Sequence, residues 1–363
     1  MNTFSNRKNI SLFLVLLTVI TTLNGVCMGL ASYFDKTVSI FGFIQMMIPA
    51  TVTFLVFLIL SDKSIPFPKY VCRAVFLTDI FAIIWAVLEG LFLSPSLSES
   101  GDFIILILGT ASLYLAIFFE SADARERYGF SCKNSLQNIK HIFGYVFLFI
   151  VLYTAFSFIQ VLFEYFGGNH SILMAFVEEY SHFPPELFFI LFFFAIVSLP
   201  YFGEEYGWRG FLQPWLQKRF GMQKGIILTG VVWGIWHLPM FFDAYQFSFR
   251  FSVLIPVLIG KIAFCISIGI FIGYVYLKTK NIWLCVIIHY LNNGMNQLID
   301  PSTGESSLNF LLEIAVLIFA ALLVYAPFIH SKVFRDKEII DDFILPRKPS
   351  ISQQQESDHQ ESK

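Results

Sequence analysis

Residues 251–277 read FSVLIPVLIGKIAFCISIGIFIGYVYL, a run of 27 residues in which Lys261 is the one charged side chain. An α-helix needs about 20 mostly apolar residues to cross the hydrocarbon core of a bilayer. The run also lacks the alternation of a β-barrel strand, and lipid offers no water to satisfy the backbone of an open structure. The stretch therefore predicts a transmembrane helix.

Nine other stretches have the same character, and the composition agrees with them. The chain of 363 residues is 56% hydrophobic and 14% charged, with a mean hydropathy of +0.68, whereas a soluble domain carries about 25% charged residues. We therefore expect an all-α, polytopic transmembrane bundle of about ten spans. The expected spans are Ile10–Tyr33, Ser39–Leu60, Tyr70–Leu93, Phe103–Phe119, His141–Phe166, Glu186–Glu204, Gly225–Phe242, Phe251–Leu277, Ile282–Ile299 and Leu308–Ile329.

Positive charges fall in every second loop of this arrangement, apart from Lys36 and Arg250. Because cytoplasmic loops carry an excess of Lys and Arg, the pattern predicts that both termini are cytoplasmic. The cationic positions are Arg7, Lys8, Lys63, Lys69, Arg125, Arg127, Lys133, Lys140, Lys218, Arg219, Lys224, Lys278, Lys280, Lys332, Arg335, Lys337, Arg347 and Lys348. The net charge of −2 gives no indication of a nucleic-acid partner.

Cysteine chemistry is not expected to contribute. The five cysteines form no CxxC pair, and four of them fall in apolar stretches. This pattern predicts small buried side chains rather than disulfides or a cysteine-based metal site.

A carboxylate pair lies at the end of the sixth expected span, in Glu204-Glu205-Tyr206-Gly207-Trp208-Arg209. On a helix, Glu205 and Arg209 are four residues apart and share a face, so the guanidinium can neutralise that carboxylate. Glu204 then points about 100° away and is left to exchange protons with a substrate or water. The competing interpretation is a charged helix end at the membrane surface.

Two histidines and an amide lie in later spans. His237 follows Trp233 and precedes Pro239, which can break or kink the helix beside it. His289 and Asn293 are four residues apart and face the same way. Alternatively, His237 could be a core residue that is hydrogen-bonded to a backbone carbonyl, and His289 and Asn293 could form hydrogen bonds that hold membrane helices together. Together with Glu204 they could perform acyl-bond hydrolysis, because Glu activates water and His and Asn hold an oxyanion.

The order E-E-x-x-x-R, aromatic-x-x-x-H and H-x-x-x-N resembles the CAAX prenyl protease type II family, whose bacterial relatives are called CPBP, for CAAX proteases and bacteriocin-processing enzymes. The similarity covers roughly residues 185–300, and the strings EEYGWRGFL and WGIWHLP look like the bacterial branch. One departure is Trp233, where the family's motif often has Phe. The resemblance implies that Glu204 and His237 activate water and that His289 and Asn293 stabilise the oxyanion.

The same resemblance implies that Glu205 and Arg209 support the site, and it leaves the cofactor open. A metal-free glutamate mechanism is one possibility. The other is zinc held by Glu204, His237 and His289, which would form a His₂Glu set with one open position. The motif H-E-x-x-H is absent from the sequence.

The expected function is an intramembrane endopeptidase that acts on membrane-associated peptides or proteins, in the cytoplasmic membrane of a bacterium. The alternatives are a non-enzymatic membrane protein for bacteriocin immunity or partner binding and, with less support, a transporter. The expected domains are N-terminal spans over 1–183, a protease core over 184–300, a last span over 301–331 and a disordered polar tail over 332–363.

Asp79, Glu89, Lys261 and Glu313 are further ionisable side chains inside expected spans. An isolated charge in lipid is costly, so we expect Lys261 to pair with a carboxylate of a neighbouring span. A place along a substrate or proton path is the alternative.

Overall fold

The computed structural model describes residues 7–60, 66–92, 95–131, 135–244, 251–298 and 308–347. All regular secondary structure in these ranges is helical, which confirms the all-α prediction. The α-helices are α1 (Arg7–Tyr33), α2 (Ser39–Leu60), α3 (Lys69–Phe92), α4 (Pro95–Phe119), α5 (Ala122–Arg127), α6 (Ser135–Phe166), α7 (Ile172–Val197), α8 (Leu199–Glu205), α9 (Gln213–Phe220), α10 (Met222–Trp236), α11 (Leu238–Ala244), α12 (Phe251–Thr279), α13 (Ile282–Leu298) and α14 (Phe310–Tyr325).

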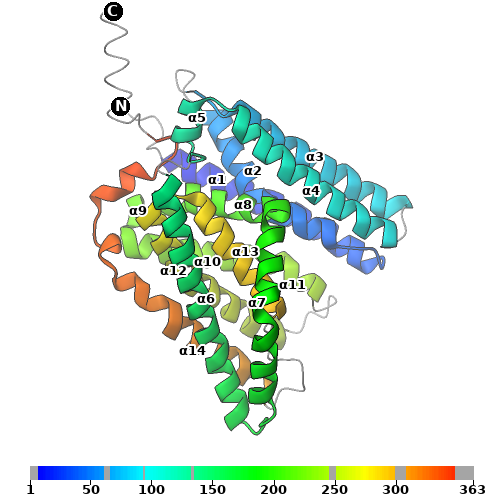
Figure 1. Cartoon of the computed structure of the whole chain (residues 1–363). Helices are drawn as coiled ribbons and strands as arrows, with labels where there is room; N and C mark the ends of the chain where they lie inside the picture. Colours follow the sequence, from blue (N-terminus) through cyan, green and yellow to red (C-terminus); the bar gives the residue numbers. More distant parts are fainter. Residues whose placement is uncertain are drawn as a thin grey trace, which may run out of the picture.

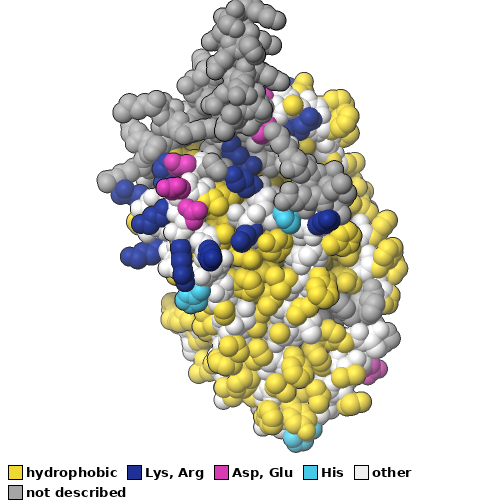
Figure 2. Space-filling model, turned by 60° about the vertical axis from the view of Figure 1, so that its left-hand side comes forward, with side chains coloured by type: hydrophobic (Ala, Val, Ile, Leu, Met, Phe, Trp, Pro, Cys, Tyr) yellow, Lys and Arg dark blue, Asp and Glu magenta, His cyan; other side chains and the backbone are white. Residues whose placement is uncertain are grey.

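The surface of the bundle is that of a membrane protein. In the described part, eight helices are long and apolar enough to cross a bilayer, and a bent pair in α7 makes a ninth span if it is counted as one. Large apolar side chains such as Phe118 and Phe143 are each 73% exposed. Lys and Arg gather toward one end of the face in Figure 2, and the surface beyond them is mostly hydrophobic. The chain is therefore an integral, multi-pass membrane protein.

Two of the ten expected spans differ from the prediction. The stretch Glu186–Glu204 is not one straight helix, because α7 ends at Val197 and α8 begins at Leu199, with Pro200 in its first turn. The first part of α7 is also bent by 61° relative to its second part. The other exception is α13, whose 17 residues are fewer than the roughly 20 that a span needs. The prediction that both termini are cytoplasmic stays a prediction.

The helices of the three motifs lie together in the middle of the bundle (Figure 1). Helix α8 packs against both α2 and α13, and α10 packs against α12. Glycines allow the closest of these approaches. A Cβ atom on Gly207, two residues after the end of α8, would lie 2.3 Å from Cβ of Pro49 in α2, and one on Gly234 would lie 2.6 Å from Cα of Ile262 in α12. Side chains longer than glycine's hydrogen would separate these helices.

The segment after α14 is ordered over a longer stretch than the sequence predicted. Residues 332–347 include short 3₁₀-helices at Lys332–Phe334 and Glu338–Asp342. Phe334 and Phe343 are buried, which gives this polar segment an apolar anchor. The expectation of disorder from residue 332 is therefore wrong as far as residue 347, and residues 348–363 lie outside the described ranges.

Candidate active site

The carboxylate motif lies where an α-helix changes its winding. Helix α8 ends at Glu205 and continues directly as a π-helix over Tyr206–Leu212. Every residue of that π-helix is buried. Such single wide turns within helices occur frequently at functional sites, because they change the direction of the side chains that follow.

The expected contact between Glu205 and Arg209 is present. Nη1 of Arg209 lies 3.0 Å from Oε1 of Glu205, and both side chains are 0% exposed. The same carboxylate oxygen lies 2.9 Å from Nδ1 of His289, close enough for an ion pair but without the alignment of a hydrogen bond. Glu205 thus contacts two of the other predicted residues, one on its own helix and one on α13.

Glu204 is held by two tryptophans rather than left without a partner. Its Oε2 accepts one hydrogen bond from Nε1 of Trp208 at 3.2 Å and a second from Nε1 of Trp233 at 2.7 Å. The side chain is 2% exposed. Both indoles use the same oxygen, so Oε1 is the atom of Glu204 that remains for a reacting group.

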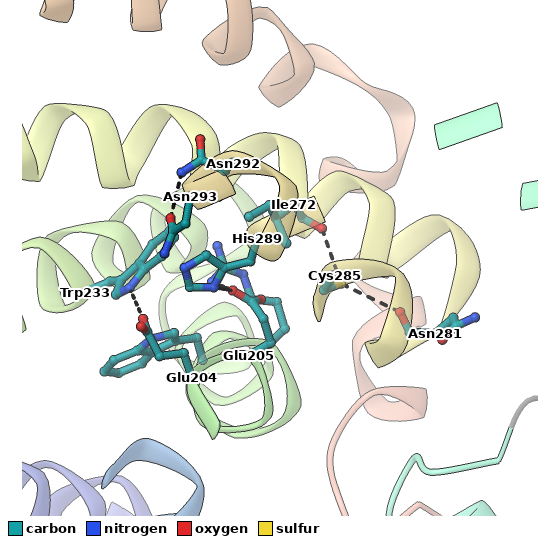
Figure 3. A network of polar contacts seen from close by, with 11 residues as sticks. Glu204, Glu205, Trp233, Ile272, Asn281, Cys285, His289, Asn292 and Asn293 are labelled. Carbon is teal, nitrogen blue, oxygen red and sulfur yellow. Dashed lines mark hydrogen bonds and ion pairs between the residues drawn. The ribbon is translucent and has the colours of Figure 1, made fainter. Parts of the chain in front are cut away.

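Trp233 contacts four of the predicted residues. Besides its hydrogen bond to Glu204, its ring lies 4.5 Å from the guanidinium carbon of Arg209 and 5.3 Å, edge to face, from the ring of His289. Its carbonyl oxygen lies 2.7 Å from Nδ1 of His237. Figure 3 shows the indole between Glu204 and the residues of α13. The sequence identified this position only as the aromatic residue of a motif.

His237 is fixed by the end of α10. A carbonyl oxygen can only accept a hydrogen bond, so Nδ1 of the neutral ring donates to Trp233 and Nε2 keeps its lone pair. Helix α10 ends at Trp236, and the carbonyl of Trp236 accepts a hydrogen bond from Nε2 of Gln45 at 2.9 Å. A side chain of α2 therefore satisfies a carbonyl next to His237, which no local sequence pattern could indicate.

Asn293 is partly buried and lies one turn beyond His289 on α13. Its Oδ1 accepts a hydrogen bond from Nδ2 of Asn292 at 3.1 Å. The side chain also interacts with Tyr201, whose ring lies 5.4 Å from that of His289. Because the amide oxygen of Asn293 is already engaged, its Nδ2 group is the part that can donate to a substrate.

The structure thus brings the six predicted site residues together near Trp233. Figure 3 shows Glu204, Glu205, His289 and Asn293 around the indole. Arg209 and His237 are placed there by their contacts with Trp233. The sequence did not indicate the donor roles of Trp208 and Asn292. The role of Trp208 could have been predicted from spacing, because Trp208 lies four residues after Glu204, on the same side of a helix.

A zinc ion in this site would take Glu204, His237 and His289 as its ligands. Nε2 of His237 makes no hydrogen bond among the described residues and would suit a metal, and the Nδ1 contact resembles the outer partner of a ligating histidine. However, no three His, Cys, Asp or Glu side chains in the described ranges are arranged to hold a metal ion. The set Glu204, His237 and His289 therefore does not fit a metal ion as it stands.

Comparison with known proteins gives two matches in this region. Residues 185–295 match the family described as type II CAAX prenyl endopeptidase Rce1-like. The chain is also 32% identical over 123 residues to "CAAX prenyl protease 2" of Methanococcus maripaludis; the aligned part is 32% of this chain and 45% of that protein. The chain therefore spans about half the length of the curated relative that it matches. Both matches confirm the family resemblance expected from the three motifs.

Proposed function

Because residues 185–295 are an Rce1-like segment, we propose that this chain is an intramembrane endopeptidase. The observation that supports this most directly is the convergence on Trp233 of a carboxylate, two imidazoles and an amide. Oε1 of Glu204, Nε2 of His237 and Nε2 of His289 make no hydrogen bond among the residues that the structure describes. Nδ2 of Asn293 carries two N–H groups, so it can donate to a substrate in addition to its contact with Tyr201.

In this proposal, Glu204 and His237 activate the attacking water. Oε1 of Glu204 or Nε2 of His237 takes a proton from water as its oxygen bonds to the carbonyl carbon of the substrate. The two indole N–H groups keep the other oxygen of Glu204 in place, so the carboxylate does not have to reorient during the reaction. The same proton later goes to the amide nitrogen of the substrate, and the C–N bond breaks.

His289 and Asn293 stabilise the oxyanion that forms on the substrate carbonyl. Nδ2 of Asn293 donates directly, because Asn292 already holds the amide oxygen. When both nitrogens of His289 carry protons, Nε2–H donates as well, and Glu205 balances the positive charge at Nδ1. Arg209 in turn balances Glu205, so the supporting pair keeps the buried site near neutrality.

The proposed substrate is a membrane-associated peptide or protein. The named relative is a prenyl protease, and the site here lies within a bundle whose outer surface faces lipid. A substrate anchored in or on the membrane would reach such a site without crossing bulk water.

The test compares the peptides released from membranes by the wild-type chain with those released by Glu204→Ala and His237→Ala. Glu178→Gln, which changes an exposed carboxylate in α7, is the matched control. We expect a set of cleavage products that is present with wild type and the control and absent with both site variants. Folding is checked by thermal unfolding in detergent, and bound metal is measured in the same samples. Products that persist in both site variants would contradict the proposal.

A further inference from the structure

Lys261 carries a charge well inside α12 without an acidic partner in the described ranges. It is the eleventh residue of α12 and lies ~15 Å along the axis from the first residue. The side chain is partly buried. The expected ion pair with a carboxylate of a neighbouring span is not found, since Lys261 takes part in no ion pair or hydrogen bond within the part of the chain that the structure describes.

The register of α12 places Lys261 on the side of the helix that faces the site. Cys265 and Gly269 follow it at intervals of four residues, along one ridge of the helix. A Cβ atom on Gly269 would lie 3.6 Å from Nη2 of Arg209. Cys265 is 1% exposed and interacts electrostatically with Lys261, Glu204 and Arg209. Lys261 is therefore the next position along the ridge that borders the carboxylate pair.

The packing of α12 on α10 brings the same residue close to His237. Gly230 meets Ile266 and Gly234 meets Ile262 in backbone contact, so the two helices run antiparallel at this point. His237 lies three residues beyond Gly234, directly after the end of α10, and Lys261 lies directly before Ile262 in α12. The imidazole of His237 interacts electrostatically with the ammonium group of Lys261. Lys261 thus borders the site on the side of His237.

From this position we infer that the ammonium group of Lys261 is an anion subsite. It binds a carboxylate of the peptide substrate close to the peptide bond that is cleaved beside His237. The inference rests on the proposed function. An ammonium group in an apolar environment is stable when an anion neutralises it. Arg209 already has Glu205 as its partner, whereas Lys261 has no acid of its own among the described residues. A peptide brings that anion as its terminal carboxylate or as an acidic side chain.

The experiment uses the full chain in phosphatidylcholine nanodiscs, which carry no net lipid charge. The probe is one peptide that wild type cleaves and Glu204→Ala does not, in three forms: with a free C-terminus, with an amidated C-terminus, and with its acidic side chains changed to amides. kcat and KM are measured for wild type, Lys261→Met and Lys261→Arg. Binding of the free-acid and amidated forms is also measured with Glu204→Gln, with and without Lys261→Met.

We expect Lys261→Met to raise KM for the carboxylate form by about tenfold or more, with kcat nearly unchanged and Lys261→Arg close to wild type. If wild type and Lys261→Met have the same KM for the peptide with an amidated C-terminus, the terminal carboxylate is the one bound. If they have the same KM for the peptide whose acidic side chains are amides, an acidic side chain is bound. An equal loss on all three forms, or an unchanged binding ratio of acid to amide, would overturn the subsite. If no peptide is cleaved in a Glu204-dependent way, the proposed function itself fails, which is a different result.

Discussion

The hydrogen bond from Trp233 to Glu204 is the contact whose loss tests the site geometry most sharply. Trp233→Phe removes the Nε1–H donor that lies 2.7 Å from Oε2 of Glu204. It keeps an aromatic face for Arg209, whose guanidinium lies 4.5 Å from the indole, and it leaves the carbonyl that holds His237 unchanged. Trp208 still donates to the same oxygen, from 3.2 Å. The substitution therefore removes the shorter of the two donors, together with the ring atoms by which an indole is larger than a phenyl group.

The magnitude follows from the charge of the acceptor. A hydrogen bond to a charged group contributes about 1.5–3 kcal/mol, which corresponds to roughly 10- to 150-fold in a rate. Only the part of that energy that differs between ground state and transition state affects kcat, and Trp208 compensates for some of it. We therefore expect kcat of Trp233→Phe to fall by about 10- to 100-fold. KM should change little, because the lost bond orients Glu204 and not the substrate.

Trp236 provides the matched control. It lies in the same helix and is 4% exposed, but its Nε1 makes no hydrogen bond within the described part of the chain. Trp236→Phe thus loses the same ring atoms without losing a donor. The two variants are compared by kcat and KM on a cleaved peptide and by thermal unfolding in detergent. Equal losses of kcat in both variants would refute the assignment, because the effect would then come from packing.

Three further substitutions test the surroundings of the site. Arg209→Met should destabilise the chain by about 3–5 kcal/mol, since it leaves the fully buried Glu205 carboxylate without its cation; thermal unfolding measures this, and an unchanged midpoint would contradict a buried pair. Asn293→Ala should lower kcat by about 10²- to 10³-fold with little change in KM, as expected for loss of an oxyanion donor; a KM effect without a kcat effect would assign Asn293 to substrate binding instead. Gly234→Ala should cost about 1–3 kcal/mol because its Cβ atom would lie 2.6 Å from the α12 backbone. Gly144→Ala, with nothing within 4 Å of the added atom, is the control, and equal stability of the two would show that the helices can separate freely.

Local rules predicted part of the site correctly. The contact of Glu205 with Arg209 follows from a spacing of four residues, and it is present although the intervening turn is a π-helix. The same rule predicted that Glu204 points away from that pair and has no partner of its own. The absence of a partner is wrong. Its two donors come from Trp208, which the same spacing could have found, and from Trp233, which lies 29 residues away in sequence. Contacts between residues so far apart in sequence depend on how the helices pack against one another, and the periodicity of a single helix carries no information about that packing.

Hydropathy predicted the membrane bundle but could not place every break in it. An apolar run registers in the same way whether it faces lipid or packs against another helix, so α8 could not be separated from α7 by composition. The break is instead set by Pro200 and by the tight approach of α8 to α2. Similarly, the ordered residues 332–347 are mostly polar in sequence and are held by a few buried side chains such as Phe343.

The segment that matches the Rce1-like family, residues 185–295, is in contact with α2, which lies outside it. Gln45 satisfies the carbonyl of Trp236 at the point where α10 ends, so an unpaired backbone oxygen would otherwise lie beside His237 in an apolar environment. The π-helix also packs against α2. Gly207 contacts Pro49 of α2 so closely that a larger residue at position 207 would clash. One helix outside the matched segment therefore contacts two of its three motifs. Substitutions in α2 that are remote in sequence from the carboxylates and histidines should act on the site through these two contacts.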